Sequence, residues 1–201
     1  MKYTLFDPRA CQLGEGAFWH PERQQAFWFD ILGRRMLSRK DGRELEWRFD
    51  ERVSAAGWID HDTLIIASET ALFRFNLKNG NREDLVPLEA DRPDTRSNDG
   101  RADPQGGFWI GTMAVDGSPG QGAIYRYYKG ELRKLFAPIS ISNAICFSPD
   151  GAFVLFSSYA TNLPGEDEWN SSLNVFRLEV ATGVITVVIG ALPFLGLVVP
   201  N

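Results

Sequence analysis

Short apolar stretches recur along the chain, separated by turns rich in Gly, Pro, Asp and Asn. The first group of them predicts four consecutive strands, at 17–19, 25–30, 35–38 and 44–49. Within this group, Asp41-Gly42 is a typical two-residue hairpin turn. No segment sustains the 3.6-residue period of an amphipathic helix, so the pattern predicts an all-β fold.

The same order of strands and turns occurs four times. The equivalent first positions of the four units are Glu15, Ala55, Asn98 and Asn143, which lie 40, 43 and 45 residues apart. Four short strands in each unit of about 40 to 45 residues are typical of β-propeller blades. Because a propeller typically closes its ring with about 4–8 blades, the chain is either a small propeller or a shortened member of a larger one.

The composition fits a single globular domain over residues 1–201. The chain has 21 basic and 26 acidic side chains, a net charge of −5 and no basic block, which argues against a nucleic-acid partner. Its two cysteines cannot form a disulfide framework and are typical of a reduced, cytoplasmic protein. Asp7 and Pro8 precede any apolar stretch long enough for a signal peptide. Cys146 lies in the apolar stretch 144–147, where we expect a buried, unreactive thiol.

The last part of the chain is unusually apolar. No charged residue occurs between Val180 and Asn201, and residues 184–200 are almost wholly apolar. This length is close to the lower limit of about 17 residues for a membrane span. However, Gly and Pro residues interrupt it, and residues 184–189 are rich in β-branched side chains. A buried strand followed by an apolar terminus is therefore favoured, and no membrane association is expected.

The predicted blades bring distant residues together. The innermost strand of each blade lines the central channel, so its equivalent positions converge around one axis. Glu15, Asn98 and Asn143 would then supply carboxylate and amide oxygens, which suit Ca²⁺, Mg²⁺ or Mn²⁺. In the alternative interpretation, Asn98 begins a turn and Asn143 is a hydrogen-bonded residue at the start of a strand.

Several motifs of the chain resemble those of one protein family. They are LGEGAFW at 13–19, RSNDGRADPQG at 96–106, WIGTM at 109–113, and ISNA at 141–144 followed by SPDG at 148–151. In order and spacing they are similar to the motifs of the senescence-marker-protein/gluconolactonase/luciferin-regenerating-enzyme (regucalcin-like) family. The resemblance covers roughly residues 10–152.

The resemblance implies a six-bladed propeller, of which this chain would hold about four blades. It also implies one divalent cation (Ca, Zn, Mn or Mg) in the channel and hydrolysis of a sugar lactone to an aldonic acid. In this family's pattern, Glu15 and Asn143 match metal-binding positions. Arg96, Asn98 and Asp116 match substrate-binding positions, and Asn98 lies close enough to the metal to be a further ligand.

The chain also departs from the family. The family's catalytic aspartate has no counterpart, and residues 153–201 are atypical, as in a truncated or frame-shifted sequence. The first hypothesis is therefore a metal-dependent, gluconolactonase-like enzyme of carbohydrate metabolism, impaired by its shortened site. The alternatives are a non-catalytic calcium-binding or ligand-binding propeller and an inactive fragment. The sequence predicts no oligomeric state.

Overall fold

Four antiparallel sheets of four strands each make up the computed structural model, which describes residues 4–159 and 174–189. Blade 1 contains β1 (Gly14–His20), β2 (Gln25–Asp30), β3 (Arg35–Lys40) and β4 (Arg43–Arg48). Blade 2 contains β5 (Val53–Trp58), β6 (Thr63–Ser68), β7 (Ala71–Asn76) and β8 (Arg82–Pro87). Blade 3 contains β9 (Thr95–Ala102), β10 (Phe108–Ala114), β11 (Gly122–Tyr128) and β12 (Glu131–Ile139). Blade 4 contains β13 (Asn143–Phe147), β14 (Phe153–Ser158), β15 (Asn174–Glu179) and β16 (Ile185–Ile189).

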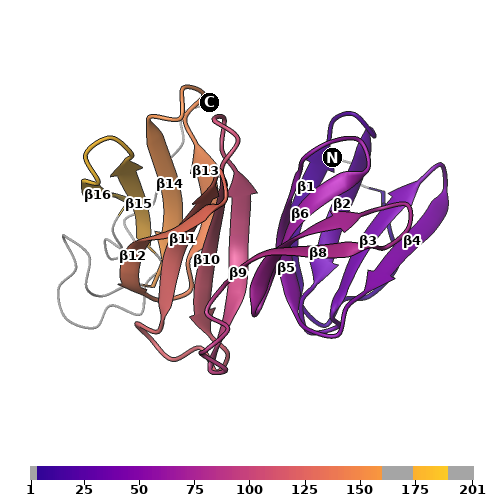
Figure 1. The fold of residues 1–201 in the computed structure, drawn as a ribbon, viewed down its shortest axis with the longest axis horizontal. Helices are drawn as coiled ribbons and strands as arrows, with labels where there is room; N and C mark the ends of the chain where they lie inside the picture. Colours follow the sequence, from indigo (N-terminus) through magenta and orange to yellow (C-terminus); the bar gives the residue numbers. More distant parts are fainter. Residues whose placement is uncertain (1–3, 160–173, 190–201) are drawn as a thin grey trace.

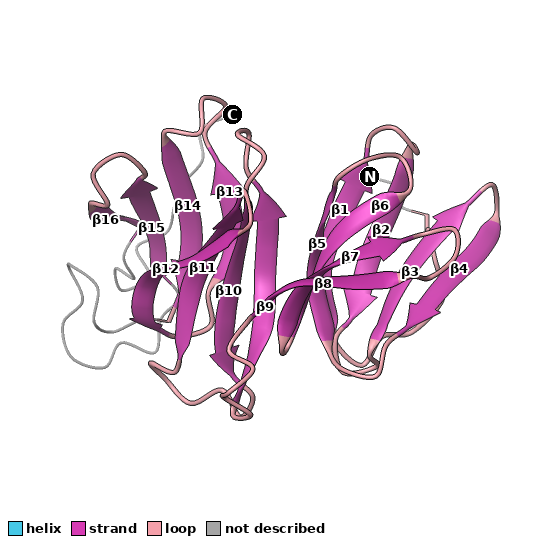
Figure 2. Cartoon of the chain, in the orientation of Figure 1, coloured by secondary structure: helices cyan, strands magenta, loops and turns pink. Residues whose placement is uncertain are grey.

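The blades follow one another around an arc, and their first strands lie on its inner side. β1 contacts β5, β5 contacts β9, and β9 contacts β13. Figure 1 shows β5 and β9 meeting in the middle of the molecule, with blade 1 on one side and blade 4 on the other. The described residues contain strands and loops but no helix (Figure 2). The all-β propeller arrangement that the repeats predicted is therefore confirmed.

The core consists of three apolar clusters, one between each pair of neighbouring blades. Successive residues of a strand point to opposite faces of its sheet, so a middle blade must be apolar on both faces. On β6, Leu64 and Ile66 face the cluster shared with blade 1, whereas Ile65 and Ala67 face the cluster shared with blade 3. This explains why β6 has a continuous apolar run instead of an alternating pattern.

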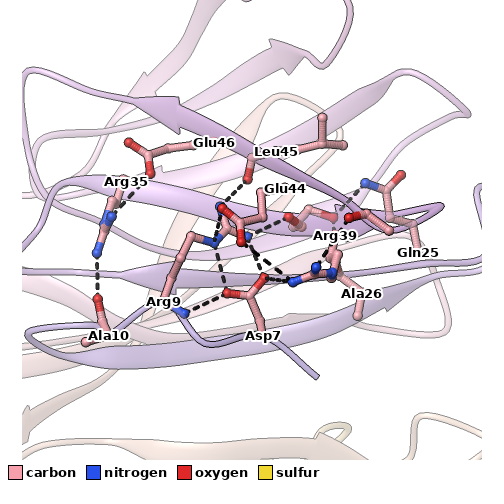
Figure 3. A network of polar contacts seen from close by, with 12 residues as sticks. Asp7, Arg9, Ala10, Gln25, Ala26, Arg35, Arg39, Glu44, Leu45 and Glu46 are labelled. Carbon is pink, nitrogen blue, oxygen red and sulfur yellow. Dashed lines mark hydrogen bonds and ion pairs between the residues drawn. The ribbon is translucent and has the colours of Figure 1, made fainter. Parts of the chain in front are cut away.

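The N-terminal segment covers the face of blade 1 that points away from blade 2. Arg9 donates hydrogen bonds to the carbonyl oxygens of Leu45 and Ser38, and its guanidinium lies 5.5 Å from the ring centre of Trp28. Asp7 accepts a hydrogen bond from Arg9 at 2.8 Å and lies 3.5 Å from Arg39 (Figure 3). The Arg9 hydrogen bond lowers the pKa of Asp7 to about 2. These contacts fasten the chain before β1 to three strands of blade 1.

The expectation of a buried thiol at Cys146 is wrong. Cys146 is exposed, as is Leu155, which pairs with it on β14. Their neighbours Val154 and Phe156 point to the other face of the sheet and pack against blade 3. Cys146 therefore lies on the face of blade 4 that points away from the other blades.

Residues 185–189 form the predicted strand, β16. The expectation that this strand is buried is wrong for its described side chains, because Val188 is 51% exposed and Ile185 and Thr186 are only partly buried. Among residues 4–159 and 174–189, no helix has the length and hydropathy needed to cross a membrane. The remainder of the predicted apolar terminus, residues 190–201, lies outside the described residues.

Candidate active site

A β-bulge in each inner strand sets the direction of the candidate site residues. Glu15 and Asn143 are each the last paired residue before the bulge in β1 and β13. The residue that follows has a positive φ in both strands, 60° at Gly16 and 55° at Ala144. Glu15 and Asn143 therefore occupy equivalent positions in blades 1 and 4. Both lie beside a bulge, which re-aims neighbouring side chains.

Gly16 fixes the distance between the inner strands of blades 1 and 2. A Cβ atom at this position would lie 2.1 Å from the carbonyl oxygen of Ser54, which is a backbone atom of β5. Only glycine allows both this approach and the left-handed conformation. The sequence Glu15-Gly16 therefore places the carboxylate next to a tight backbone contact with blade 2.

Blades 2 and 3 differ by one or two residues from the predicted alignment. The last paired residue before the bulge is Val53 in β5 and Ser97 in β9, so the positions equivalent to Glu15 are not Ala55 and Asn98. The predicted alignment is wrong at these positions because a bulge adds one residue to a strand without adding a pair. Asn98 thus lies within the bulge of β9.

Arg96 and Asn98 are brought together at the start of β9. They are 7% and 6% exposed, and Nη1 of Arg96 donates to Oδ1 of Asn98 at 2.9 Å. Burial lowers the pKa of Arg96, and the charge of Arg52 lowers it further, whereas the carboxylate of Glu15 raises it. The guanidinium of Arg96 therefore lies within electrostatic reach of Glu15.

Three side chains of β9 hold the start of the neighbouring inner strand β13. Asn98 donates from Nδ2 to the carbonyl oxygen of Ser142 at 3.0 Å. Oδ2 of Asp99 accepts from the N–H of Ile145 at 2.6 Å, and Nε of Arg101 donates to the carbonyl oxygen of Ile145 at 3.0 Å. We call Asn98, Asp99 and Arg101 the β9–β13 clasp.

The clasp fixes the short segment that contains Asn143. Ile141 and Ala144 both have left-handed backbones, with φ of 49° and 55°, a conformation that is unfavourable for residues with a Cβ atom. Oδ1 of Asn143 accepts from the N–H of Ala144 at 3.1 Å. Burial raises the pKa of Asp99, the central residue of the clasp. Asp99 and Arg101 both lie in the motif at 96–106, but no sequence signal indicated their bonding roles.

Asp116 lies at the same end of blade 3 but makes a different set of contacts. It follows β10, whose residue Met113 pairs with Arg96. Asp116 is exposed, and its Oδ1 accepts from the N–H of Ser118 at 2.9 Å. It helps to line a cavity of about 470 Å³ together with Asp94. Within the described residues, no contact joins Asp116 to Arg96.

We call the part of the inner strands that carries Glu15, Arg96, Asn98 and Asn143 the channel end. Its oxygen atoms fit a hard divalent cation only in part. Across residues 4–159 and 174–189, the partly buried carboxylate of Glu15 makes no hydrogen bond or ion pair, so its oxygens are free to bind an ion. Asn143 can add its amide oxygen, which accepts one hydrogen bond from the uncharged N–H of Ala144 and keeps a second lone pair, whereas the donor to Asn98 is a cationic guanidinium. Oδ1 of Asn98 already accepts from Arg96, which favours a substrate-binding role for Asn98 over a ligand role. No group of three or more His, Cys, Asp or Glu side chains suited to a metal occurs in the described part.

The described fold is a β-propeller arrangement, and its inner strands carry the candidate site residues. The sequence matches the family described as "SMP-30/Gluconolactonase/LRE-like region" over residues 13–184. The chain belongs to this family, as the motifs indicated.

Three relatives illustrate the similarity. A provisionally named sugar lactone lactonase of Rhizobium meliloti is 38% identical over 155 residues, covering 76% of this chain and 52% of that protein. The L-arabinolactonase of Azospirillum brasilense is 36% identical and covers 76% of this chain and 53% of that protein. The crystal structure of a calcium-binding protein, regucalcin, from Agrobacterium tumefaciens has a TM-score of 0.81 and 35% identity. It covers 90% of this chain and 60% of that chain. The present chain thus spans about half the length of the curated relatives.

Proposed function

We propose that this chain carries the site of a sugar lactone hydrolase that works with one divalent cation, Ca, Zn, Mn or Mg. The substrate is a small sugar lactone, the product is the aldonic acid, and the expected compartment is the cytoplasm. Relatives named as lactonases support the substrate class. The observation that carries the proposal is the buried Arg96–Asn98 pair at the channel end of β9, within reach of the charge of Glu15.

A lactone is a cyclic ester, and its hydrolysis requires an activated water and support for the negative charge that develops on the carbonyl oxygen. A bound divalent cation acts as a Lewis acid and lowers the pKa of a coordinated water. In this chain Glu15 and Asn143 would hold the cation, since they present a carboxylate and an amide oxygen from equivalent bulges.

The chain's own polar side chains orient the substrate. Arg96 uses Nη1 for Asn98 and for the carbonyl oxygen of Ser97, so its other donors remain for the hydroxyl or ring oxygens of a lactone. Asp116, at the same end of blade 3, is proposed to contact the outer part of the substrate. Because Glu15 is the one carboxylate among these proposed ligands, we expect weak cation binding and impaired turnover.

The same scarcity of carboxylates supports a second candidate function, a non-catalytic propeller that binds a divalent cation. One structural relative is titled a calcium-binding protein. The third possibility is an inactive fragment. The three differ in what they predict for cation binding and for turnover, which can be measured separately.

The experiment combines calorimetric titration with a hydrolysis assay. The purified chain is titrated with Ca²⁺, Mn²⁺, Zn²⁺ and Mg²⁺, and acid release from glucono-1,5-lactone is followed by pH-stat. We expect metal-stimulated turnover that falls by more than about tenfold in Glu15→Gln and in Asn143→Ala. The exposed residues Glu22 and Asn81 provide matched controls, as Glu22→Gln and Asn81→Ala.

Each other result selects a different function. Cation binding without turnover supports the non-catalytic propeller. Neither binding nor turnover, with a broad and non-cooperative melt, indicates an inactive fragment. Turnover that is unchanged in Glu15→Gln contradicts the proposed site.

A further inference from the structure

A second arginine, Arg52, lies within electrostatic reach of Arg96 at the channel end. Arg52 directly precedes β5, and its successor Val53 is the last paired residue before the bulge. Arg96 stands in the same relation to Ser97 in β9. The two arginines therefore occupy equivalent positions on neighbouring inner strands.

A direct contact between these two strands holds this part of the site together. The Oγ of Ser54 donates to the Oγ of Ser97 at 2.7 Å, and both serines are buried. Ser54 lies two residues after Arg52, and Ser97 lies one residue after Arg96. The two guanidinium groups therefore extend from adjoining points of β5 and β9, and the charge of Arg52 lowers the pKa of Arg96.

The hydrogen-bonding capacity of this pair is not fully used. Nη1 of Arg52 is buried and has no hydrogen-bond partner among the described residues. It lies 3.5 Å from Oε2 of Glu69, which is a loose ion pair. The two hydrogen bonds that Arg96 donates to described residues both leave from Nη1. The Arg52 side chain is still 25% exposed, and it donates no hydrogen bond to the described residues, so the accessible donors of its guanidinium remain for a ligand that supplies oxygen atoms.

We propose that Arg52 and Arg96 together bind a negatively charged substituent of the substrate, such as a carboxylate, sulfonate or phosphate. This inference deepens the proposed lactonase function and rests on it, because it assigns the substrate class. Guanidinium groups bind planar or tetrahedral oxyanions through parallel hydrogen bonds. A neutral hydroxyl group offers one oxygen and no charge, so it would leave most of these donors unused. The preferred lactone therefore carries an acidic group in addition to the carbonyl that is hydrolysed.

Three ligands of similar length differ in the number of carboxylates that they carry. D-glucarate has a carboxylate at both ends, D-gluconate has one, and sorbitol has none. Calorimetric titration of the intact chain should show glucarate binding about 10- to 100-fold more tightly than gluconate, which is the ratio expected for hydrogen bonds between charged groups. Sorbitol should bind more weakly than either.

Substitution of Arg52 tests whether this residue produces the preference. Arg52→Gln should reduce the ratio of glucarate to gluconate affinity to about 1, whereas Arg52→Lys should keep part of it. The double variant Arg52→Gln/Glu69→Gln should lose the preference for glucarate in the same way, without leaving the Glu69 carboxylate unpaired. Arg74→Gln is the matched control, because Arg74 is exposed on the same blade and its one ion pair within the described part of the chain is with Glu83 at 3.4 Å.

The remaining outcomes are decisive as well. Equal affinities for glucarate and gluconate in the unmodified chain, or a preference that survives in Arg52→Gln, would overturn the inference. Absence of binding by all three ligands would overturn it too. Failure of the proposed lactonase function can be distinguished from failure of this inference. In that case no lactone is turned over, but the Arg52-dependent preference for glucarate persists.

Discussion

The hydrogen bond between Asp99 and Ile145 is the shortest of the β9–β13 clasp and can be removed by a single substitution. Asp99→Ala deletes the acceptor that lies 2.6 Å from the N–H of Ile145, a residue that is 1% exposed. An unsatisfied buried amide costs about 1–3 kcal/mol. Loss of a carboxylate whose pKa is raised by burial returns part of this free energy. We therefore expect the free energy of unfolding to fall by about 1–2 kcal/mol.

Thermal unfolding followed by circular dichroism measures this change. For a chain of this size, 1 kcal/mol corresponds to about 2–4 °C in Tm, so Asp99→Ala should melt about 2–8 °C below the unmodified chain. Asp99→Asn keeps an acceptor oxygen and should recover most of the loss. Asp84→Ala is the surface control, because Asp84 is 64% exposed and pairs with Arg82 in solvent.

The clasp also predicts a local effect that general destabilisation does not produce. Amide hydrogen exchange at Ile145 should accelerate in Asp99→Ala well below its melting temperature, while exchange in blade 1 stays unchanged. Equal melting temperatures for Asp99→Ala and the unmodified chain would refute the reasoning. So would a variant Asp99→Asn that is as unstable as Asp99→Ala.

Two further predictions follow from local geometry. Gly16→Ala should lower Tm at least twice as much as Gly42→Ala. Both glycines have positive φ. However, an added Cβ atom meets the carbonyl oxygen of Ser54 at position 16, whereas it meets open space at position 42. Similar Tm losses would show that backbone conformation alone matters. Asp7→Asn should lower Tm at pH 7. The difference should shrink as the pH falls from 4 to 2 and be lost below pH 2, because the folded-state pKa of Asp7 is about 2, below its ordinary value of 3.8. A Tm difference that does not change over this pH range would exclude the contact with Arg9 as its source.

The strands could be predicted from the sequence because local signals and the fold agree in most of the chain. In the hairpins at Asp41-Gly42 and Lys129-Gly130, both turn residues have positive φ, as the two-residue turns of hairpins require. The apolar run of β6 is buried on both faces of its sheet. Turn residues and apolar runs are short-range features, and they fix where strands begin and end.

The register of the inner strands could not be predicted in the same way. A bulge adds one residue without changing the hydrophobic pattern, so the alignment placed Asn98 where the structure has Ser97. The exposure of Cys146 was missed because a strand's own sequence does not show whether a further sheet covers its second face. The register depends on the neighbouring strand of the same blade, as in the pairing of Ser97 with Thr112, and the exposure of Cys146 depends on what lies beyond blade 4. Neither can be read from the residues of one strand.

The inner strand of blade 3 connects the parts of the candidate site. β9 bonds to blade 2 through Ser97 and to blade 4 through the clasp. The two proposed metal ligands, Glu15 and Asn143, belong to blades 1 and 4, which are the ends of the described arc. Their separation is therefore set by three successive contacts between blades, and two of these involve β9. A substitution in β9 that shifts blade 4 would change the distance between Glu15 and Asn143 while leaving both side chains intact. Cation affinity should thus respond to Asp99→Ala as well as to substitutions of the ligands themselves.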